Sequence, residues 1–313
     1  MIEKYCSHFP VLKDEILQFL QPQKGQIFID GTLGLAGHSS EILKKIKPCG
    51  HLFAFDLDQN NINLAQKVLQ KISPNFTVFN QNFAYMSDFV PLTLQGKIDG
   101  VLLDIGLCMT HLKNSDRGFS FLSEEPLDMR FSQQQSLKAS EVVNNFSEKE
   151  IIDILKNFGQ EKEARKITKA IVEYRKKNLF QSSKQLAELI EKVKKSKKGK
   201  IHPATQTFQA LRIFVNKELD SLQKGLKEAL KIIKKNAKVA VISFHSLEDR
   251  IVKNIFRQAA KKCICPPLAL KCQCERKAKF NILTKKPITP SKEEIAQNKA
   301  SRSARLRIIE KIV

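Results

Sequence analysis

The sequence predicts an α/β fold in which a parallel sheet carries an all-helical insertion, and three observations support this prediction. An apolar segment at residues 27–29 is followed by a glycine-containing loop and then by helical spacing at 39–46. Further apolar segments alternate with helical ones as far as residue 104. Residues 111–200 then show helix and loop patterns but no convincing strand. Alternating strands and helices are typical of a parallel sheet, and a long helical stretch within the alternation indicates an insertion.

The first part of the chain supplies its expected elements in regular order. A short amphipathic helix at 12–20 precedes the first strand. Compact runs of apolar, strand-forming residues, as in buried parallel strands, predict further strands at 52–55, 76–79 and 97–104. Apolar residues at helical spacing predict a helix at 60–72, between the second and third strands.

The insertion is expected to consist of amphipathic helices at 146–158, 162–175 and 182–193. Ser147, followed three residues later by Glu150, is typical of a helix N-terminus. The lysine-rich run at 192–200 predicts a solvated loop.

The last part of the chain returns to the sheet. Its patterns predict helical structure at 202–235, a strand at 238–244, a helix at 246–260 and closing strands at 280–283 and 306–309. We therefore expect a sheet domain in two parts, residues 1–112 and 214–313, and a helical domain at 113–213.

Composition limits the classes of protein to which the chain can belong. Its 313 residues are 42% apolar, which suffices for a full core and for two domains. No apolar run approaches the roughly 20 residues that span a bilayer. The first residues lack the basic-then-apolar layout of a signal peptide, so we expect a cytoplasmic protein without a membrane partner.

The charge balance favours a polyanionic partner. The net charge is +22, from 54 lysines and arginines against 32 acids, and nucleic acid is the partner that this excess suggests. Basic residues of the expected helix at 162–175 and just beyond it recur at helical spacing: Lys162, Arg165, Lys166, Lys169, Arg175, Lys176 and Lys177. They predict a face that contacts RNA phosphates, and the alternative is a merely solvated face.

The loop after the first strand is a candidate nucleotide site. Three glycines lie within seven positions, where they allow close approach of a ligand to the backbone. Such a loop alone also fits an ordinary tight turn. However, the second strand ends in Asp56, 22 residues after Gly34, at the position where such folds bind a ribose. Together these features predict a cofactor of the adenosine type.

Cysteines form a second candidate site near the C-terminus. Seven cysteines without an export signal suggest thiols or metal ligands and not a disulfide framework. A Cys-x-Cys pair recurs after six residues, at Cys263, Cys265, Cys272 and Cys274. Four thiolates this close could hold a tetrahedral zinc ion, and the alternative is a reduced loop without metal.

With these features established, the sequence resembles the bacterial 16S rRNA cytosine-N4-methyltransferases, which use S-adenosylmethionine. The resemblance is carried by ordered motifs along the whole chain, at residues 8–15, 30–39, 104–106, 117–121, 126–130, 158–159 with 161, 202–205 with 208–213, 215–216 with 218–219, 242–253 and 303–307. It implies a Rossmann-like methyltransferase sheet with an inserted all-helical domain. It also implies S-adenosylmethionine as cofactor, 16S rRNA or the small ribosomal subunit as partner, and methylation of a cytidine in the decoding region. It leaves the oligomeric state open, with a homodimer as one alternative.

The resemblance also implies the site residues. Cofactor contacts are expected from Gly34, Ala36, Gly37, His38, Asp56, Phe83, Asp104 and His111. The groups expected to face the cytosine are Asp104, Arg117, Asp128, Arg130 and His245. Structural alternatives are a strand-end cap for Asp104, a hydrogen bond within the loop for His38, and a buttressing core residue for His245.

The segment at residues 107–111 departs from the pattern that the resemblance implies. Residues 107–111 lack two serines and a glutamine of that pattern, and His111 could replace the hydrogen bond of the glutamine. This departure motivates an alternative function, that of a non-catalytic rRNA-binding or ribosome-assembly protein with the same fold. A dinucleotide-dependent oxidoreductase is a third alternative.

Overall fold

The computed structural model describes residues 10–112, 116–194, 202–263, 265, 274 and 277–313. The chain divides into two compact units. The first, here called the sheet unit, comprises Met1–Gly106 and Leu219–Val313, and the second, the helical unit, comprises Leu107–Glu218. These limits differ by about half a dozen residues from the expected boundaries at 112 and 213. One reason is that a helix continuing to Asn216 packs inside the helical unit.

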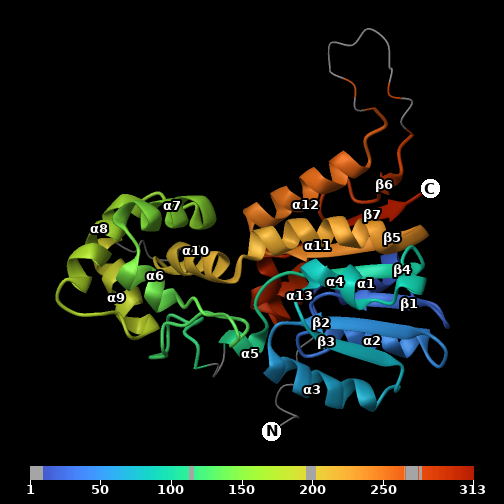
Figure 1. Cartoon of the computed structure of the whole chain (residues 1–313), viewed down its shortest axis with the longest axis horizontal. Helices are drawn as coiled ribbons and strands as arrows, with labels where there is room; N and C mark the ends of the chain where they lie inside the picture. The colour runs from blue at the N-terminus through green and yellow to red at the C-terminus, as the bar shows by residue number, and fades with distance from the viewer. Residues whose placement is uncertain (1–9, 113–115, 195–201, 264, 266–273, 275–276) are drawn as a thin grey trace. The chain divides into compact units, whose positions relative to one another are not determined.

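A seven-stranded sheet forms the centre of the sheet unit, in the order β3-β2-β1-β4-β5-β7-β6 (Figure 1). Strands β1 to β5 pair in parallel, whereas β7 is antiparallel to β5 and β6. Their bounds are β1 Ile27–Asp30, β2 His51–Asp56, β3 Phe76–Asn80, β4 Ile98–Asp104, β5 Ile233–Ser243, β6 Phe280–Ile282 and β7 Arg305–Lys311. The order reverses between β1 and β4, and ligands bind such folds at the carboxyl ends of the strands beside this reversal.

Helices cover both faces of this sheet. One buried cluster combines residues of α1 Lys13–Leu20, α2 Gly37–Ile46 and α3 Gln59–Gln70 with the sheet. The other lies on the opposite face and includes residues of α4 Met86–Phe89, α11 Glu218–Ile232 and α12 Ser246–Ala259. The unit also contains the short elements η1 Phe83–Tyr85, η2 Leu92–Leu94, α13 Lys292–Gln297 and η3 Lys299–Ser303, which were not predicted.

The start of β5 corrects a prediction. Helical structure was expected as far as residue 235, but α11 ends at Ile232 and β5 begins at the next residue. Ile233 pairs with Ile98, and the register then shifts so that Lys238 pairs with Gly100. Asn236 has a left-handed φ of 63° within this irregular segment. Pairing with a neighbouring strand therefore overrides the local helical pattern.

The helical unit has a core of its own. Its helices are α5 Met109–Leu112, α6 Ala139–Asn145, α7 Glu148–Gly159, α8 Ala164–Arg175, α9 Ser183–Val193 and α10 Thr205–Asn216. The predicted N-terminus of α7 is confirmed, because Ser147 and Glu150 form a reciprocal capping box. Helix α6 was not predicted. Within the described part of the chain, no helix of either unit combines the length and apolar character needed to cross a membrane.

Candidate active site at the carboxyl edge of the sheet

The loop between β1 and α2 is held by a buried carboxylate. Asp30, the last residue of β1, accepts hydrogen bonds from Ser39 Oγ at 2.7 Å and from the Thr32 N–H at 3.0 Å. Burial raises the pKa of Asp30 even though these hydrogen bonds oppose the shift. Gly34 and Ala36, which lie in the chain between Asp30 and Ser39, have a left-handed backbone conformation, with φ of 51° and 64°. The loop therefore takes a backbone conformation that glycine adopts readily. Ala36 adopts the same conformation although it carries a methyl group, which is fully buried.

Asp56 joins this loop to the end of β2. Its Oδ2 accepts the Gly34 N–H at 2.8 Å, and its Oδ1 accepts the Asp58 N–H at 2.8 Å. The acid predicted to bind a ribose thus lies directly beside the glycine loop. These bonds fix the carboxylate of Asp56 beside the backbone of the glycine loop.

Asp104 ends β4, the neighbour of β1 in the sheet. Its backbone N–H donates to Thr32 Oγ1 at 2.6 Å, and its Oδ2 lies 3.6 Å from Nε2 of the buried His38. Among the described residues its buried Oδ1 has no hydrogen-bond partner. Burial, and then the negative charges of Asp30 and Glu248, raise the pKa of Asp104 to about 8. This carboxyl group is therefore able to exchange a proton near neutral pH.

His245 follows β5 and begins α12. Its Nδ1 accepts the Glu248 N–H at 3.4 Å, while Glu248 Oε2 accepts the Phe244 N–H at 2.8 Å and the His245 N–H at 3.2 Å. The His245 Nε2 atom lies 3.0 Å from Glu248 Oε1. Glu248 is fully buried. The structure thus gives His245 a helix-capping contact, the kind of structural role considered as its alternative.

Phe83 lies in η1, after the carboxyl end of β3. A Cβ atom on Gly225 of α11 would come within 2.4 Å of the Phe83 ring, and one on Gly31 would lie 3.0 Å from Phe83 Cβ. Glycine at both positions therefore lets the segment after β3 approach the loop after β1 and helix α11. The Asn82 side chain adds a hydrogen bond to Ser221 of α11 at 2.9 Å.

The sheet unit therefore brings together most of the predicted cofactor residues. They lie at or just after the carboxyl ends of β1, β2, β3 and β4: Gly34, Ala36, Gly37, His38, Asp56, Phe83 and Asp104. The sequence patterns did not predict Asp30 and Glu248 as site residues, although both lie in the motifs at 30–39 and 242–253. Their negative charges raise the pKa of Asp104 because the ends of β1, β4 and β5 lie side by side in the sheet.

The other four predicted residues belong to the helical unit. Arg117 is buried and donates to the carbonyl groups of Arg130 and Phe131 at 3.3 and 3.1 Å. Arg130 makes two hydrogen bonds of 2.7 Å to the Asp128 carboxylate. His111 packs against the rings of Phe119 and Phe131, with both centroid separations at 5.1 Å, and these two rings stack on each other at 5.5 Å. Its Nδ1 accepts the Cys108 N–H at 3.2 Å.

Asn216, at the end of α10, holds the backbone of residues 129–131 in place. Its side chain donates to the Met129 carbonyl at 2.7 Å and accepts the Phe131 N–H at 2.8 Å. Met129 itself has a left-handed φ of 60°. The motif residues around 126–130 and 215–219 thus support one another within the helical unit.

Comparison with known proteins identifies the family. The sequence profile of the MraW methylase family matches residues 5–312. The chain belongs to the MraW methylase family. The resemblance drawn from the sequence motifs is confirmed at this level, and the seven-stranded α/β sheet agrees with the predicted methyltransferase fold.

Relatives of this methylase are similar over almost their full length. A protein of Caldicellulosiruptor saccharolyticus named ribosomal RNA small subunit methyltransferase H is 42% identical, over 98% of this chain and 99% of that protein. A protein of the same name from Citrifermentans bemidjiense is also 42% identical, over 97% and 98%. Among solved structures, an rRNA methylase from Streptococcus thermophilus has a TM-score of 0.44 at 8% identity, covering 96% of this chain and 95% of that one.

Proposed function

We propose that this methylase transfers the methyl group of S-adenosylmethionine to N4 of a cytidine in the decoding region of 16S rRNA. Family membership and the names of the relatives support an rRNA substrate. The observation that carries the chemical assignment is Asp104, whose buried carboxyl group ends β4 beside the glycine loop.

The residues of the carboxyl edge fit S-adenosylmethionine. The proposed contacts are the left-handed loop at Gly34 and Ala36 for the methionine end of the cofactor and the Asp56 carboxylate, at the end of β2, for its ribose. The buried Oδ1 of Asp104 at the same edge, which has no hydrogen-bond partner among the described residues, supports a bound polar ligand there. When bound, the cofactor supplies an electrophilic methyl group on a sulfonium. The residues that would hold it are Gly34, Ala36, Gly37, His38, Asp56 and Phe83. Of the other two predicted contacts, Asp104 is assigned here to the target amine, and His111 belongs to the helical unit.

We assign Asp104 as the group that accepts the proton of the target amine. The exocyclic amine of cytosine is nearly non-basic, because its lone pair is delocalised into the ring. As the N4–carbon bond forms and the carbon–sulfur bond breaks, the amine becomes acidic and must release one proton. A carboxylate at Asp104 accepts a hydrogen bond from the amine and then this proton. We propose that His38, whose Nε2 lies 3.6 Å from the same carboxylate, passes the proton on.

Methyl incorporation and cofactor binding test this function together. Purified protein is incubated with labelled S-adenosylmethionine and unmodified small subunits, and the nucleosides are separated and identified by mass spectrometry. We expect label in N4-methylcytidine from the decoding region. Label in another nucleoside would contradict the assignment of the target base. Binding of rRNA without methylation would favour the alternative, a non-catalytic ribosome-assembly protein.

Asp56→Asn is expected to weaken S-adenosylmethionine binding by roughly tenfold to a hundredfold. The change removes a charged hydrogen-bond acceptor, and such bonds contribute about 1.5–3 kcal/mol. Isothermal calorimetry measures the dissociation constant, and Asp88→Asn, a change at an exposed acid of the same unit, is the matched control. Equal affinity of wild type and Asp56→Asn would rule out a ribose contact.

The basic residues of α8 are proposed to contact rRNA phosphates. Four residues in or beside α8 are exposed and form no ion pair within the part of the chain that the structure describes: Lys162, Arg165, Lys169 and Lys177. The other three members of the predicted set are engaged: Lys166 lies 3.5 Å from Glu163, Lys176 lies 2.7 Å from Glu173, and Arg175 donates to a carbonyl group. The proposed contact face is therefore narrower than the sequence pattern suggested.

The double variant Arg165→Gln/Lys169→Gln is expected to bind rRNA about tenfold more weakly. Loss of two phosphate contacts should also reduce the slope of log affinity against log salt by about 1.5. Filter binding at several salt concentrations measures both quantities. Lys67→Gln/Lys71→Gln, at exposed positions of the sheet unit, makes the same change in net charge. Equal losses in both variants would mean that only net charge matters.

A further inference from the structure

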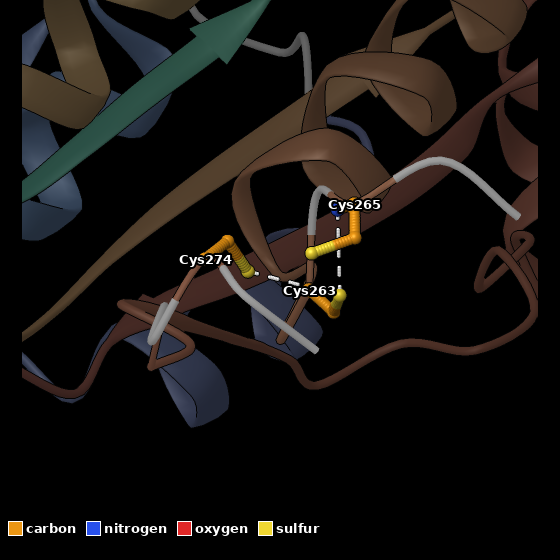
Figure 2. A group of neighbouring side chains, drawn as sticks. All are labelled: Cys263, Cys265 and Cys274. Carbon is orange, nitrogen blue, oxygen red and sulfur yellow. Dashed lines mark hydrogen bonds between the residues drawn. The ribbon is translucent and has the colours of Figure 1, made fainter. Parts of the chain in front are cut away.

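The structure brings three cysteines together after the end of α12. All three sulfur atoms of Cys263, Cys265 and Cys274 lie within 4.8 Å of one another. Figure 2 shows the side chain of Cys274 reaching toward Cys263 from a separate part of the chain. Cys272, the fourth residue of the predicted cluster, lies outside the described residues. We propose that the three described thiols form a zinc-binding site.

The sulfur–sulfur distance agrees with a shared metal ion. Cys263 Sγ and Cys274 Sγ are 3.7 Å apart, whereas the sulfur atoms of a disulfide are separated by only about 2.05 Å. A tetrahedral zinc ion with Zn–S bonds of about 2.3 Å places its ligand sulfurs about 3.8 Å from one another. A zinc ion could therefore bridge these two sulfurs with little change in their separation.

A backbone hydrogen bond prepares one sulfur for metal binding. The Cys265 N–H donates to Cys263 Sγ at 3.4 Å. This contact holds Cys263 Sγ beside the backbone of the second cysteine of the pair. The Cys-x-Cys spacing thus keeps the two ligand sulfurs close to each other before an ion binds.

Exposure allows an ion to reach the site. Cys263 is exposed, and Cys265 and Cys274 are partly exposed. Soft thiolate ligands select zinc over the hard cations magnesium and calcium. Bound zinc would join the chain just after α12 to residue 274, only a few residues before β6, and this role is structural and independent of methyl transfer.

Metal binding by the full-length protein tests the proposal. The reduced, metal-free chain is titrated with Co²⁺ and then with Zn²⁺, and absorption and metal content are measured. We expect one metal per chain, thiolate-to-cobalt charge-transfer bands of at least three thiolates, tetrahedral d–d bands, and loss of these bands when zinc displaces cobalt. Absence of the charge-transfer bands, or bands of fewer than three thiolates, would overturn the proposal.

Substitutions locate the site. Cys263→Ser should weaken zinc binding by at least about 100-fold, because it removes the sulfur that contacts both other cysteines. Cys263→His should retain zinc with one thiolate fewer, which would show that the first loss comes from the missing ligand. Cys49→Ser, at an exposed cysteine outside the cluster, should leave affinity unchanged. Equal zinc affinity in wild type and Cys263→Ser, or equal weakening in Cys49→Ser, would contradict this site.

Discussion

Asp104→Asn is expected to reduce methyl transfer by at least about a hundredfold while the protein remains folded. Asparagine preserves the shape of the side chain but cannot take up the proton that the cytosine amine releases, and proton transfer by a positioned group contributes about 10²–10⁴-fold. Single-turnover methylation of unmodified small subunits measures the loss. Calorimetry with S-adenosylmethionine separates chemistry from binding, because cofactor affinity should change little. Retained activity would remove Asp104 from the mechanism.

The pH dependence of activity gives a second measurement on the same residue. Because the pKa of Asp104 is raised to about 8, most of the carboxyl groups are protonated at pH 7. The carboxylate is the form that accepts a proton, so wild-type kcat/KM should rise with pH until about pH 8 and then level off. The residual activity of Asp104→Asn should lack this rise. A wild-type profile that is flat between pH 6 and 8 would contradict the proposed role.

The contribution of Asp104 to the free energy of unfolding should fall as pH rises, whereas its contribution to activity rises. The pKa of Asp104 is higher in the folded protein than the value of about 4 in an unfolded chain, so the folded state binds the proton more tightly. Its stabilising contribution is complete below about pH 4 and is lost as pH rises through about 8. Asp104→Asn should therefore gain in melting temperature relative to wild type between pH 5 and 9. Asp88→Asn serves as the exposed control, and a difference that does not grow with pH would contradict the prediction.

Asp249→Ala is expected to destabilise the protein by about 3–5 kcal/mol. Asp249 of α12 receives hydrogen bonds from Arg307 of β7 at 2.6 and 3.1 Å, and Arg307 is buried. Arg305 adds a longer contact of 3.4 Å. Removing the carboxylate leaves a buried guanidinium without its charged partner, which is the costly way to break such a pair. Urea unfolding measures the change in the free energy of unfolding.

Two further measurements test the stabilising role of the Asp249 carboxylate. Burial alone would raise the pKa of Asp249, but the hydrogen bond and charge of Arg307 lower it overall, so its contribution should disappear as pH falls through that lowered pKa. Glu173→Ala breaks an exposed ion pair with Lys176 and should leave the urea midpoint nearly unchanged. Similar midpoints for Asp249→Ala and wild type would show that the buried pair does not stabilise the fold.

Several elements could be predicted because their signals are local. The apolar run before Asp104 is by itself typical of a buried strand. The carboxyl ends of parallel strands meet at one edge of a sheet, which predicts where Asp104 lies. Ser147 and Glu150 are close enough in the chain to cap α7 by themselves. The beginning of β5 could not be predicted in the same way, because it depends on pairing with Ile98 from a distant segment.

For the candidate site, the sequence by itself determined the glycine loop, the acids that end β2 and β4, and the family to which the chain belongs. These features are properties of residue type and spacing. Only the tertiary structure decided that Asp30 and Glu248 act on Asp104, and that Asp249 pairs with Arg307, 58 residues later. Hydrogen bonds, burial and charge coupling depend on distance in space, which composition and periodicity along the chain do not specify.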